Sequence, residues 1–310
     1  MISQAVIAAL EGFVPKENIH KNEPMSRHTT FRIGGEADCL IEVEDTDQLI
    51  KVLEYIRKVE IPFFVLGNGS NLLVSDEGYR GIIIKIGNKM SKITVEGNHI
   101  TAQAGVRLGK VAAVAMEHDL KGLAFASGIP GTIGGAVVMN AGAYGGEMCQ
   151  VITSVTVVSE DGEVLQLDNP TMEFGYRTSI IKKRPLIVVE AQLELSEGNK
   201  DEIRAEMEEL AGKRIAKQPL EYPSAGSTFK RPEGYFAGEL IQKSGLAGFR
   251  VGEAEVSTKH CGFVINTGNA TASDVMQVIR GVQKKVLEVY GVELEPEVIF
   301  LGEFREDKAE

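Results

Sequence analysis

The stretch GIPGTIGGAVVMNAGAYGG, residues 128–146, holds seven glycines in nineteen positions. The 34 glycines of the 310-residue chain would predict roughly two in such a window. Residues 131–135 precede the small, apolar residues 136–141, a pattern typical of a helix N-terminus. There, free amide groups and the helix dipole favour a closely approaching polyphosphate. The alternative is tight packing of a helix on a sheet, which needs glycine without any ligand.

A second glycine-rich loop lies in VLGNGSNLLV, residues 65–74. Gly67, Asn68 and Gly69 resemble the opening of a dinucleotide-binding fingerprint, but Leu72 occupies the position of the third glycine and extended chain follows instead of a helix. Such a turn can still bind phosphate through successive backbone N–H groups, or can be a plain turn between strands. Neither loop contains Gly-Lys-Ser/Thr, so a P-loop is excluded, and two such loops favour a dinucleotide with a pyrophosphate.

Composition excludes several classes of function. A net charge of −11 argues against a nucleic-acid-binding surface, which needs clustered Lys and Arg over a broad face. Local basic islands such as residues 182–184 are either solvated surface or contacts for an anionic small molecule. The three cysteines and five histidines show neither a disulfide framework nor metal-ligand spacing, so we expect no metal. Without a basic leader or an apolar run of about 18 residues, we expect a cytoplasmic protein without membrane contact.

Hydrophobic periodicity predicts a chain of mixed helices and strands. The expected helices are residues 2–10, an amphipathic helix capped by Thr46, residues 107–119, a charged helix ending near 217, and a helix started by Thr271 and Asp274. The expected strands are residues 38–43, a buried strand at 61–67, residues 81–86, hairpins at 93–105 and 151–168, residues 186–195, and a terminal strand at 293–302. The long irregular segment 219–234, with three prolines, is typical of a functional loop.

Six blocks in order along nearly the whole chain resemble one family. The blocks are TTFRIGG (29–35), GNGSNLLV (67–74), GIPGTIGGAVVMNAGAYGGE (128–147), FGYRTS (174–179), PSAGSTFKRP (223–232) and LEPEVIFLGE (294–303). On these blocks the chain is similar to the UDP-N-acetylenolpyruvoylglucosamine reductases, flavoenzymes of peptidoglycan precursor synthesis. With no spare segment between blocks, it resembles the shorter subgroup, which lacks a substrate-covering insertion.

The resemblance implies an α+β fold. Residues 1–198 would form a vanillyl-alcohol-oxidase-type FAD-binding domain of two α+β subdomains, beginning with the N-terminal helix. Residues 199–310 would form a smaller α+β substrate-binding domain, whose C-terminal strand carries a catalytic glutamate. FAD would be held without a covalent bond. The residues that match the family's cofactor loops are Gly67, Asn68, Gly69, Ser70, Asn71, Gly131, Thr132, Gly134, Gly135, Asn140 and Gly142.

The family reaction implies roles for three further residues. NADPH reduces FAD, and UDP-N-acetylglucosamine enolpyruvate then accepts hydride at its terminal methylene carbon, which places charge on the adjoining carboxylate as an enediolate. Arg177 matches the arginine that stabilises this charge. Glu297 matches a second stabiliser, which must be protonated in the reacting complex, a state that burial or neighbouring negative charge favours. Ser227 matches the proton donor, in a role that depends on its position.

Other interpretations stay open for these residues. From the sequence alone Arg177 is a surface arginine beside a strand, Glu297 one more charged strand residue, and Ser227 a simple loop serine; no Gly-x-Ser-x-Gly elbow supports a hydrolase. Tyr176, Lys217 and Lys230 are candidates for contacting the UDP part of the substrate.

Two other classes of protein share some of these features. A related flavin oxidase acting on a small alcohol would share the FAD loops, and a non-catalytic flavin-binding protein or sensor would keep the glycines and lose the chemistry. The presence of Arg177, Ser227 and Glu297 together disfavours both. The expected partner is therefore the small-molecule substrate, and the expected state is a monomer or weak oligomer.

Overall fold

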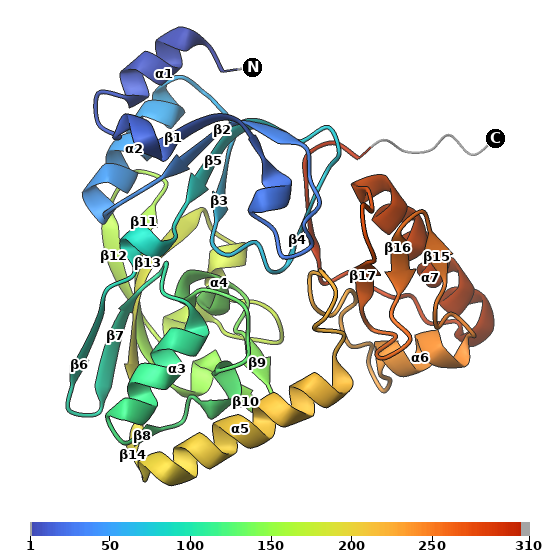
Figure 1. Cartoon of the computed structure of the whole chain (residues 1–310). Helices are drawn as coiled ribbons and strands as arrows, with labels where there is room; N and C mark the ends of the chain where they lie inside the picture. The colour runs from blue at the N-terminus through green and yellow to red at the C-terminus, as the bar shows by residue number, and fades with distance from the viewer. Residues whose placement is uncertain (1, 305–310) are drawn as a thin grey trace. The chain divides into compact units, whose positions relative to one another are not determined.

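The computed structural model describes residues 2–304 of the chain (Figure 1). By internal contacts the chain divides into two compact units: unit 1 comprises residues 1–20, 39–68 and 81–214, and unit 2 comprises residues 21–38, 69–80 and 215–310. The helices are α1 (Gln4–Leu10), α2 (Thr46–Lys58), α3 (Leu108–Glu117), α4 (Ile133–Val138), α5 (Lys200–Lys217), α6 (Ala237–Lys243) and α7 (Ala272–Tyr290). None of the helices within residues 2–304 is both long and apolar enough to cross a membrane.

The largest sheet lies in unit 1 and is antiparallel throughout (Figure 1). Its order is β12 (Val164–Asp168), β11 (Ile152–Ser159), β13 (Leu186–Glu194), β7 (His99–Gln103) and β6 (Ile93–Glu96). The two hairpins that the sequence predicts are confirmed here, because β6 pairs with β7 and β11 with β12. Helix α4 packs against β13, which places the glycine-rich segment on this sheet.

A second sheet has the order β1 (Ile19–Pro24), β2 (Glu36–Glu42), β5 (Tyr79–Lys85) and β3 (Phe63–Leu66). Strand β3 is at its edge and runs parallel to β5. The prediction of a fully buried strand at 61–67 is wrong in its burial, because Phe63 is 40% exposed on this edge strand. The chain passes between the two units within β1, β2, β5 and α5, and also between Asn68 and Gly69 in the loop after β3.

Helix α2 packs its apolar face into the core of unit 1. Its buried side chains are Gln48, Leu49, Val52, Leu53 and Ile56, which follow the spacing of one helical face. The expectation that Thr46 caps this helix is wrong. Asp45 is the N-cap residue, because its carboxylate accepts a hydrogen bond from the backbone N of Gln48 at 2.7 Å.

Unit 2 has its own apolar core around helix α7. As predicted, Thr271 and Asp274 form a capping box at the start of α7, and the helix ends at Gly291 in the left-handed conformation, φ 67°. Helix α7 packs on a small sheet of β15 (Arg250–Val251), β16 (Ala254–Val256) and β17 (Val264–Asn266) (Figure 1). Its buried face comprises Ala272, Val275, Val278, Ile279, Val282 and Val286. Each fully buried valine contributes on the order of 1.5–3 kcal/mol.

The terminal strand is shorter than predicted. Only β18 (Ile299–Leu301) is extended, and it pairs in parallel with β4 (Leu72–Val74). The remaining pairs are two-residue ladders, β8 (Leu120–Lys121) with β14 (Ser196–Glu197) and β9 (Gly142–Ala143) with β10 (Gly146–Glu147). As predicted, the segment between α5 and α6 contains no helix or strand among the described residues.

Candidate functional site

Within unit 1 the start of the GNGSN loop, Gly67 and Asn68, lies against the loop that precedes α4. Gly67 directly follows β3, and a Cβ atom built on it would lie 2.6 Å from Thr132 Oγ1. The amide Nδ2 of Asn68 donates a hydrogen bond to the carbonyl of Pro130. The start of GNGSN therefore meets the Gly131–Gly135 turn at a contact that leaves no room for a side chain on Gly67.

The glycine-rich stretch contains the predicted helix start, but two of its amides are already bonded. Thr132 is the N-cap of α4, and its hydroxyl accepts from the N of Gly135 at 3.5 Å. The N of Ile133 donates to the carbonyl of Val106 at 2.8 Å, and the N of Gly134 donates to the carbonyl of Ala104 at 2.9 Å. The expectation of free amides is wrong for these two residues, because the chain leaving β7 supplies their acceptors.

The glycines of this stretch differ in what surrounds the position that a side chain would occupy. A Cβ on Gly134 would lie 3.0 Å from the Cβ of Ala104, and one on Gly146 would lie 2.4 Å from the ring of Phe125. At these two positions glycine is needed for tight packing, which requires no ligand. Gly135 is exposed, and a Cβ on it would meet only Thr132 Oγ1, at 3.8 Å. The position in front of Gly135 is therefore open space that a methyl group would enter.

The second half of GNGSN belongs to unit 2. Gly69 has φ 61°, and a Cβ on it would lie 2.0 Å from the carbonyl oxygen of His28. Ser70 beside it is half-buried. The side-chain amide of Asn71 donates to the carbonyl of Glu297 at 3.1 Å. Asn71 thus fixes the backbone of a predicted catalytic residue, and its contact with a cofactor stays a prediction.

Arg177 lies at the third position of a tight turn in unit 1. Gly175 and Thr178 exchange backbone hydrogen bonds of 3.1 and 3.3 Å across the turn. Arg177 has φ 55°, a left-handed conformation that costs a non-glycine residue about 1–2 kcal/mol. Its Nη2 donates to the carbonyl of Gly142 at 3.3 Å, and its guanidinium lies 5.2 Å from the ring centroid of Tyr176. Backbone strain of this kind concentrates at functional sites.

Tyr176 presents its ring beside this guanidinium and is 51% exposed. An exposed aromatic ring next to a cation is available to a ligand, as the UDP-binding prediction requires. That contact stays a prediction.

Within unit 2 the structure brings Ser227 and Glu297 onto neighbouring segments. The N of Glu297 donates to the carbonyl of Thr228 at 2.8 Å. Thr228 is 1% exposed, and its hydroxyl accepts from the N of Val264 at 3.0 Å, which ties the serine loop to β17. Gly226 adopts φ 77° with open space around its Cβ position, and Ser227 is exposed. The serine is therefore held on a fixed backbone with its side chain accessible.

The two predicted lysines of unit 2 have different surroundings. Lys230 forms an ion pair with Glu295, and its backbone N also donates to the carbonyl of Glu295, at 2.8 Å. Lys217 is the exposed last residue of α5. Burial, together with the positive charge of Lys217, lowers the pKa of His260 below its ordinary value of 6.5. No motif in the sequence singles out His260 as a neighbour of Lys217.

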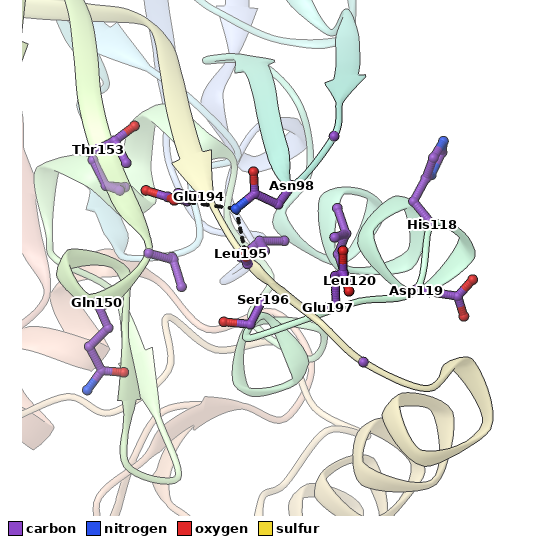
Figure 2. Close-up of a pocket in the computed structure, with 14 residues that line it drawn as sticks. Asn98, His118, Asp119, Leu120, Gln150, Thr153, Glu194, Leu195, Ser196 and Glu197 are labelled. Carbon is purple, nitrogen blue, oxygen red and sulfur yellow. Dashed lines mark hydrogen bonds between the residues drawn. The ribbon is translucent and has the colours of Figure 1, made fainter.

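Unit 1 also contains a hollow of about 1080 Å³, and none of the predicted site residues lines it. Figure 2 shows the residues that line this hollow. Its polar groups serve the fold. Asn98 Nδ2 donates to Glu194 Oε1 at 3.3 Å and to the carbonyl of Leu195 at 3.2 Å (Figure 2), and the carbonyl of Asp119 accepts from the N of Gly198 at 2.7 Å. In the described part of the chain, no group of three or more His, Cys, Asp or Glu is placed to hold a metal ion.

In the comparison with known proteins, the two halves of the chain match two different family models. Residues 37–168 match a family model described as an FAD binding domain, and residues 218–301 match the UDP-N-acetylenolpyruvoylglucosamine reductase, C-terminal domain. The UDP-N-acetylenolpyruvoylglucosamine reductase of Caldanaerobacter subterraneus subsp. tengcongensis is 50% identical over 302 residues, 97% of this chain and 100% of that protein. The enzyme of the same name from Clostridium tetani is 53% identical over 93% of each chain.

A solved structure agrees with these relatives. The crystal structure of UDP-N-acetylenolpyruvylglucosamine reductase from Thermus caldophilus aligns with a TM-score of 0.79 at 37% identity and covers 90% of this chain and 98% of that one. The predicted α+β class and the vanillyl-alcohol-oxidase-type FAD-binding fold are confirmed by this neighbour and by the FAD-domain match.

Proposed function

Because this chain belongs to the UDP-N-acetylenolpyruvoylglucosamine reductase family, we propose that it reduces the enolpyruvyl group of UDP-N-acetylglucosamine enolpyruvate to the lactyl ether of UDP-N-acetylmuramate. It is an FAD-dependent oxidoreductase with NADPH as its electron donor. The observation that carries the proposal is 50% identity along the entire length of a curated reductase. FAD, when bound, carries two electrons from NADPH to the enolpyruvyl double bond.

We propose that the paired glycine-rich loops hold FAD without a covalent bond. The proposal is supported by the contact between Gly67 and Thr132 and by the open space in front of Gly135, which a methyl group would fill. These observations fit a ligand with a pyrophosphate at that place. Ile133 and Gly134 contribute rigidity instead of phosphate contacts, because their amides bond to protein carbonyls.

We propose that Arg177 binds the substrate carboxylate and stabilises the negative charge that grows on it during reduction. A guanidinium suits this task because it is permanently charged and offers a planar fork of donors. The hydrogen bond of Nη2 to Gly142 fixes one edge of the fork before substrate arrives. Preorganised charge of this kind is usually the largest single contribution to catalysis. Tyr176, Lys217 and Lys230 are proposed as contacts for the UDP moiety.

We propose that Ser227 protonates the carbon next to the carboxylate, and that Glu297 in its protonated form stabilises the same charge. The exposed Ser227 sits on a backbone held by Thr228, and the same Thr228 carbonyl accepts from the N of Glu297. Ser227→Ala should leave flavin reduction by NADPH intact and slow the second half-reaction by about 10²–10⁴-fold. Equal loss of both half-reactions would contradict the donor role, and Ser227→Cys, which keeps a proton donor, should recover part of the rate.

An anaerobic absorption experiment tests the proposed function. The purified protein loaded with FAD should lose its visible flavin bands on addition of NADPH and regain them on addition of UDP-N-acetylglucosamine enolpyruvate. Bands that disappear and do not return would point to another flavin oxidoreductase. Failure to retain or bind FAD at all would overturn the assignment of the glycine-rich loops.

Three finer statements are proposals of the same kind. We propose that residues 1–198 bind FAD and residues 199–310 bind substrate, which is supported by the family matches at 37–168 and 218–301. We propose a monomer or weak oligomer, for which sedimentation velocity is the test. We also propose a cytoplasmic protein that does not bind nucleic acid, supported by the net charge of −11 and testable by cell fractionation and by titration with DNA.

A further inference from the structure

A buried asparagine near Arg177 has its whole side-chain amide committed to protein groups. Asn140 is 1% exposed and has φ 41°. Its Nδ2 donates to Glu147 Oε2 at 2.9 Å and to the carbonyl of Gly175 at 3.2 Å, and its Oδ1 accepts from the N of Cys149 at 2.9 Å. A carboxylate and a carbonyl only accept while a backbone N–H only donates, so the three partners fix one orientation of the amide.

One of these bonds reaches the turn that carries Arg177. Gly175 is the first residue of that turn, and its carbonyl accepts from both the N of Thr178 and Asn140 Nδ2. Immediately after the turn, the hydroxyl of Ser179 donates to the carbonyl of Val138 at 2.9 Å. Val138, the last residue of α4, and Asn140, two residues later, therefore hold the two sides of the turn.

The bond from Asn140 to Glu147 leads to the residue whose carbonyl accepts from the Arg177 guanidinium. Glu147 pairs with Gly142 in the β9–β10 ladder, and the carbonyl of Gly142 accepts from Arg177 Nη2. A Cβ on Gly142 would lie 2.7 Å from the Glu147 side chain, so the two strands are in tight contact. Asn140 thus connects the backbone of Arg177 with the acceptor of its side chain.

We propose that Asn140 is a positioning residue that holds Arg177 in its left-handed turn and aims its guanidinium at the substrate carboxylate. The inference rests on the proposed role of Arg177 in the second half-reaction. A residue at φ 55° persists only where surrounding contacts enforce that conformation. A displacement of about 1 Å at a reacting group can cost about 10²-fold in rate.

The test uses the FAD-loaded enzyme and two variants of the asparagine. Asn140→Gly tolerates the positive φ and removes the amide, and Asn140→Asp keeps the shape but presents an acceptor to Glu147 and Gly175. Single-turnover flavin reoxidation at saturating substrate should slow by about ten-fold or more in both variants. Flavin reduction by NADPH, measured at saturating FAD, should change by less than about three-fold, since the proposed role lies in the second half-reaction. Because Asn140 also matches the family's cofactor loops, the Kd for FAD is measured separately in each variant.

Asn169→Ala is the matched control. The side chain of Asn169 likewise donates two hydrogen bonds, in its case both to backbone carbonyls, that of Cys149 at 2.8 Å and that of Ile152 at 2.7 Å. Its loss should lower the melting temperature of the apoprotein by an amount similar to Asn140→Gly and leave the reoxidation rate unchanged. Slow reoxidation in Asn169→Ala as well would overturn the inference, because general loosening would then explain the effect.

A double-mutant cycle with Arg177→Ala separates this inference from the proposed function. If Asn140 acts through Arg177, Asn140→Gly slows reoxidation in the wild-type background and has no further effect when Arg177 is already alanine. Equal slowing in both backgrounds, or a weakened FAD affinity with normal reoxidation, overturns the positioning role. If Arg177→Ala itself leaves reoxidation unchanged, the proposed role of Arg177 fails, and the positioning inference fails with it.

Discussion

Gly135 and Gly134 are adjacent glycines for which the structure predicts opposite consequences of substitution. Gly135 is exposed, and an added methyl group would meet only Thr132 Oγ1, at 3.8 Å. In the apoprotein, Gly135→Ala should therefore stabilise helix α4 by about 0.5–1 kcal/mol, because alanine loses less backbone entropy than glycine. That corresponds to a rise in melting temperature of about 1–4 °C for a protein of this size.

The same methyl group should weaken FAD binding if the pyrophosphate lies in front of Gly135. Forcing one extra methyl group into a filled space costs about 1–3 kcal/mol, which raises the Kd for FAD by about five- to 150-fold. The assay is a titration of apoprotein with FAD, followed by flavin fluorescence, beside a thermal melt of the same apoprotein. Higher stability with lower affinity is the expected combination.

Gly134→Ala is the control for this prediction. Its methyl group would lie 3.0 Å from the Cβ of Ala104 and 3.3 Å from its carbonyl oxygen, so the apoprotein should lose stability by about 1–3 kcal/mol before any ligand is added. An unchanged Kd for FAD in Gly135→Ala would refute the reasoning, because the open space would then not be the cofactor's place.

Substitutions of Gly67 in unit 1 and of Glu297 and His260 in unit 2 test three further predictions. Gly67→Ala should weaken FAD binding about five-fold, because the added Cβ would lie 2.6 Å from Thr132 Oγ1 and displace this hydroxyl. In a Thr132→Ala background Gly67→Ala should cause no further loss, and additive losses would show that it does not act through the Thr132 hydroxyl. Glu297→Gln should keep part of the flavin reoxidation rate and Glu297→Ala should lose about 10²–10³-fold, whereas a wild-type rate in Glu297→Ala would remove the residue from the mechanism. Because the pKa of His260 is lowered in the folded protein, the unfolded chain binds the proton first as pH falls, and the folded protein loses stability below about pH 6.5. The melting temperature of His260→Gln should therefore fall less than that of the wild type between about pH 7.5 and 5.5. An equal fall in both proteins would contradict this.

Local sequence patterns predict those elements whose determinants are themselves local. The capping box at Thr271 and Asp274 and the hairpins of the large sheet need only a few neighbouring residues, and all are found. At the start of α2 the pattern predicts Thr46 as the cap, but the N-cap residue is Asp45. The hydrogen bond that the Asp45 carboxylate accepts from the N of Gln48 depends on the backbone geometry, which the sequence pattern does not contain.

Long-range pairing is the part of the fold that local patterns could not provide. Strand β18 pairs with β4, which lies more than two hundred residues earlier in the sequence, and each has only three residues. Such short strands are fixed by their partner instead of by their own periodicity. The same holds for the bond from Asn71 to the carbonyl of Glu297, which links two separate family blocks.

The side-chain partners of Asn140 indicate a role that a motif match alone does not reveal. In the sequence, an asparagine after a glycine-rich turn is a natural donor for a bound cofactor, and the resemblance places it among such residues. In the structure its side-chain amide forms hydrogen bonds with Glu147, Gly175 and Cys149. A buried polar group with all its side-chain partners rigidifies its surroundings, which supports the proposed positioning role, and contact of Asn140 with a cofactor stays a prediction.

The glycine-rich stretch therefore links two functions that the sequence assigns to separate blocks. At one end Thr132 and Gly135 form the proposed cofactor cradle, and at the other Gly142 offers its carbonyl to Arg177. Helix α4 joins these ends over six residues and is anchored by the amides of Ile133 and Gly134. Gly142 follows the last residue of α4 by four positions, so a displacement of this helix should move the carbonyl that accepts from Arg177, the proposed stabiliser of charge. Variants at the cradle should then slow flavin reoxidation even at saturating FAD, which a stretch serving only the cofactor would not do.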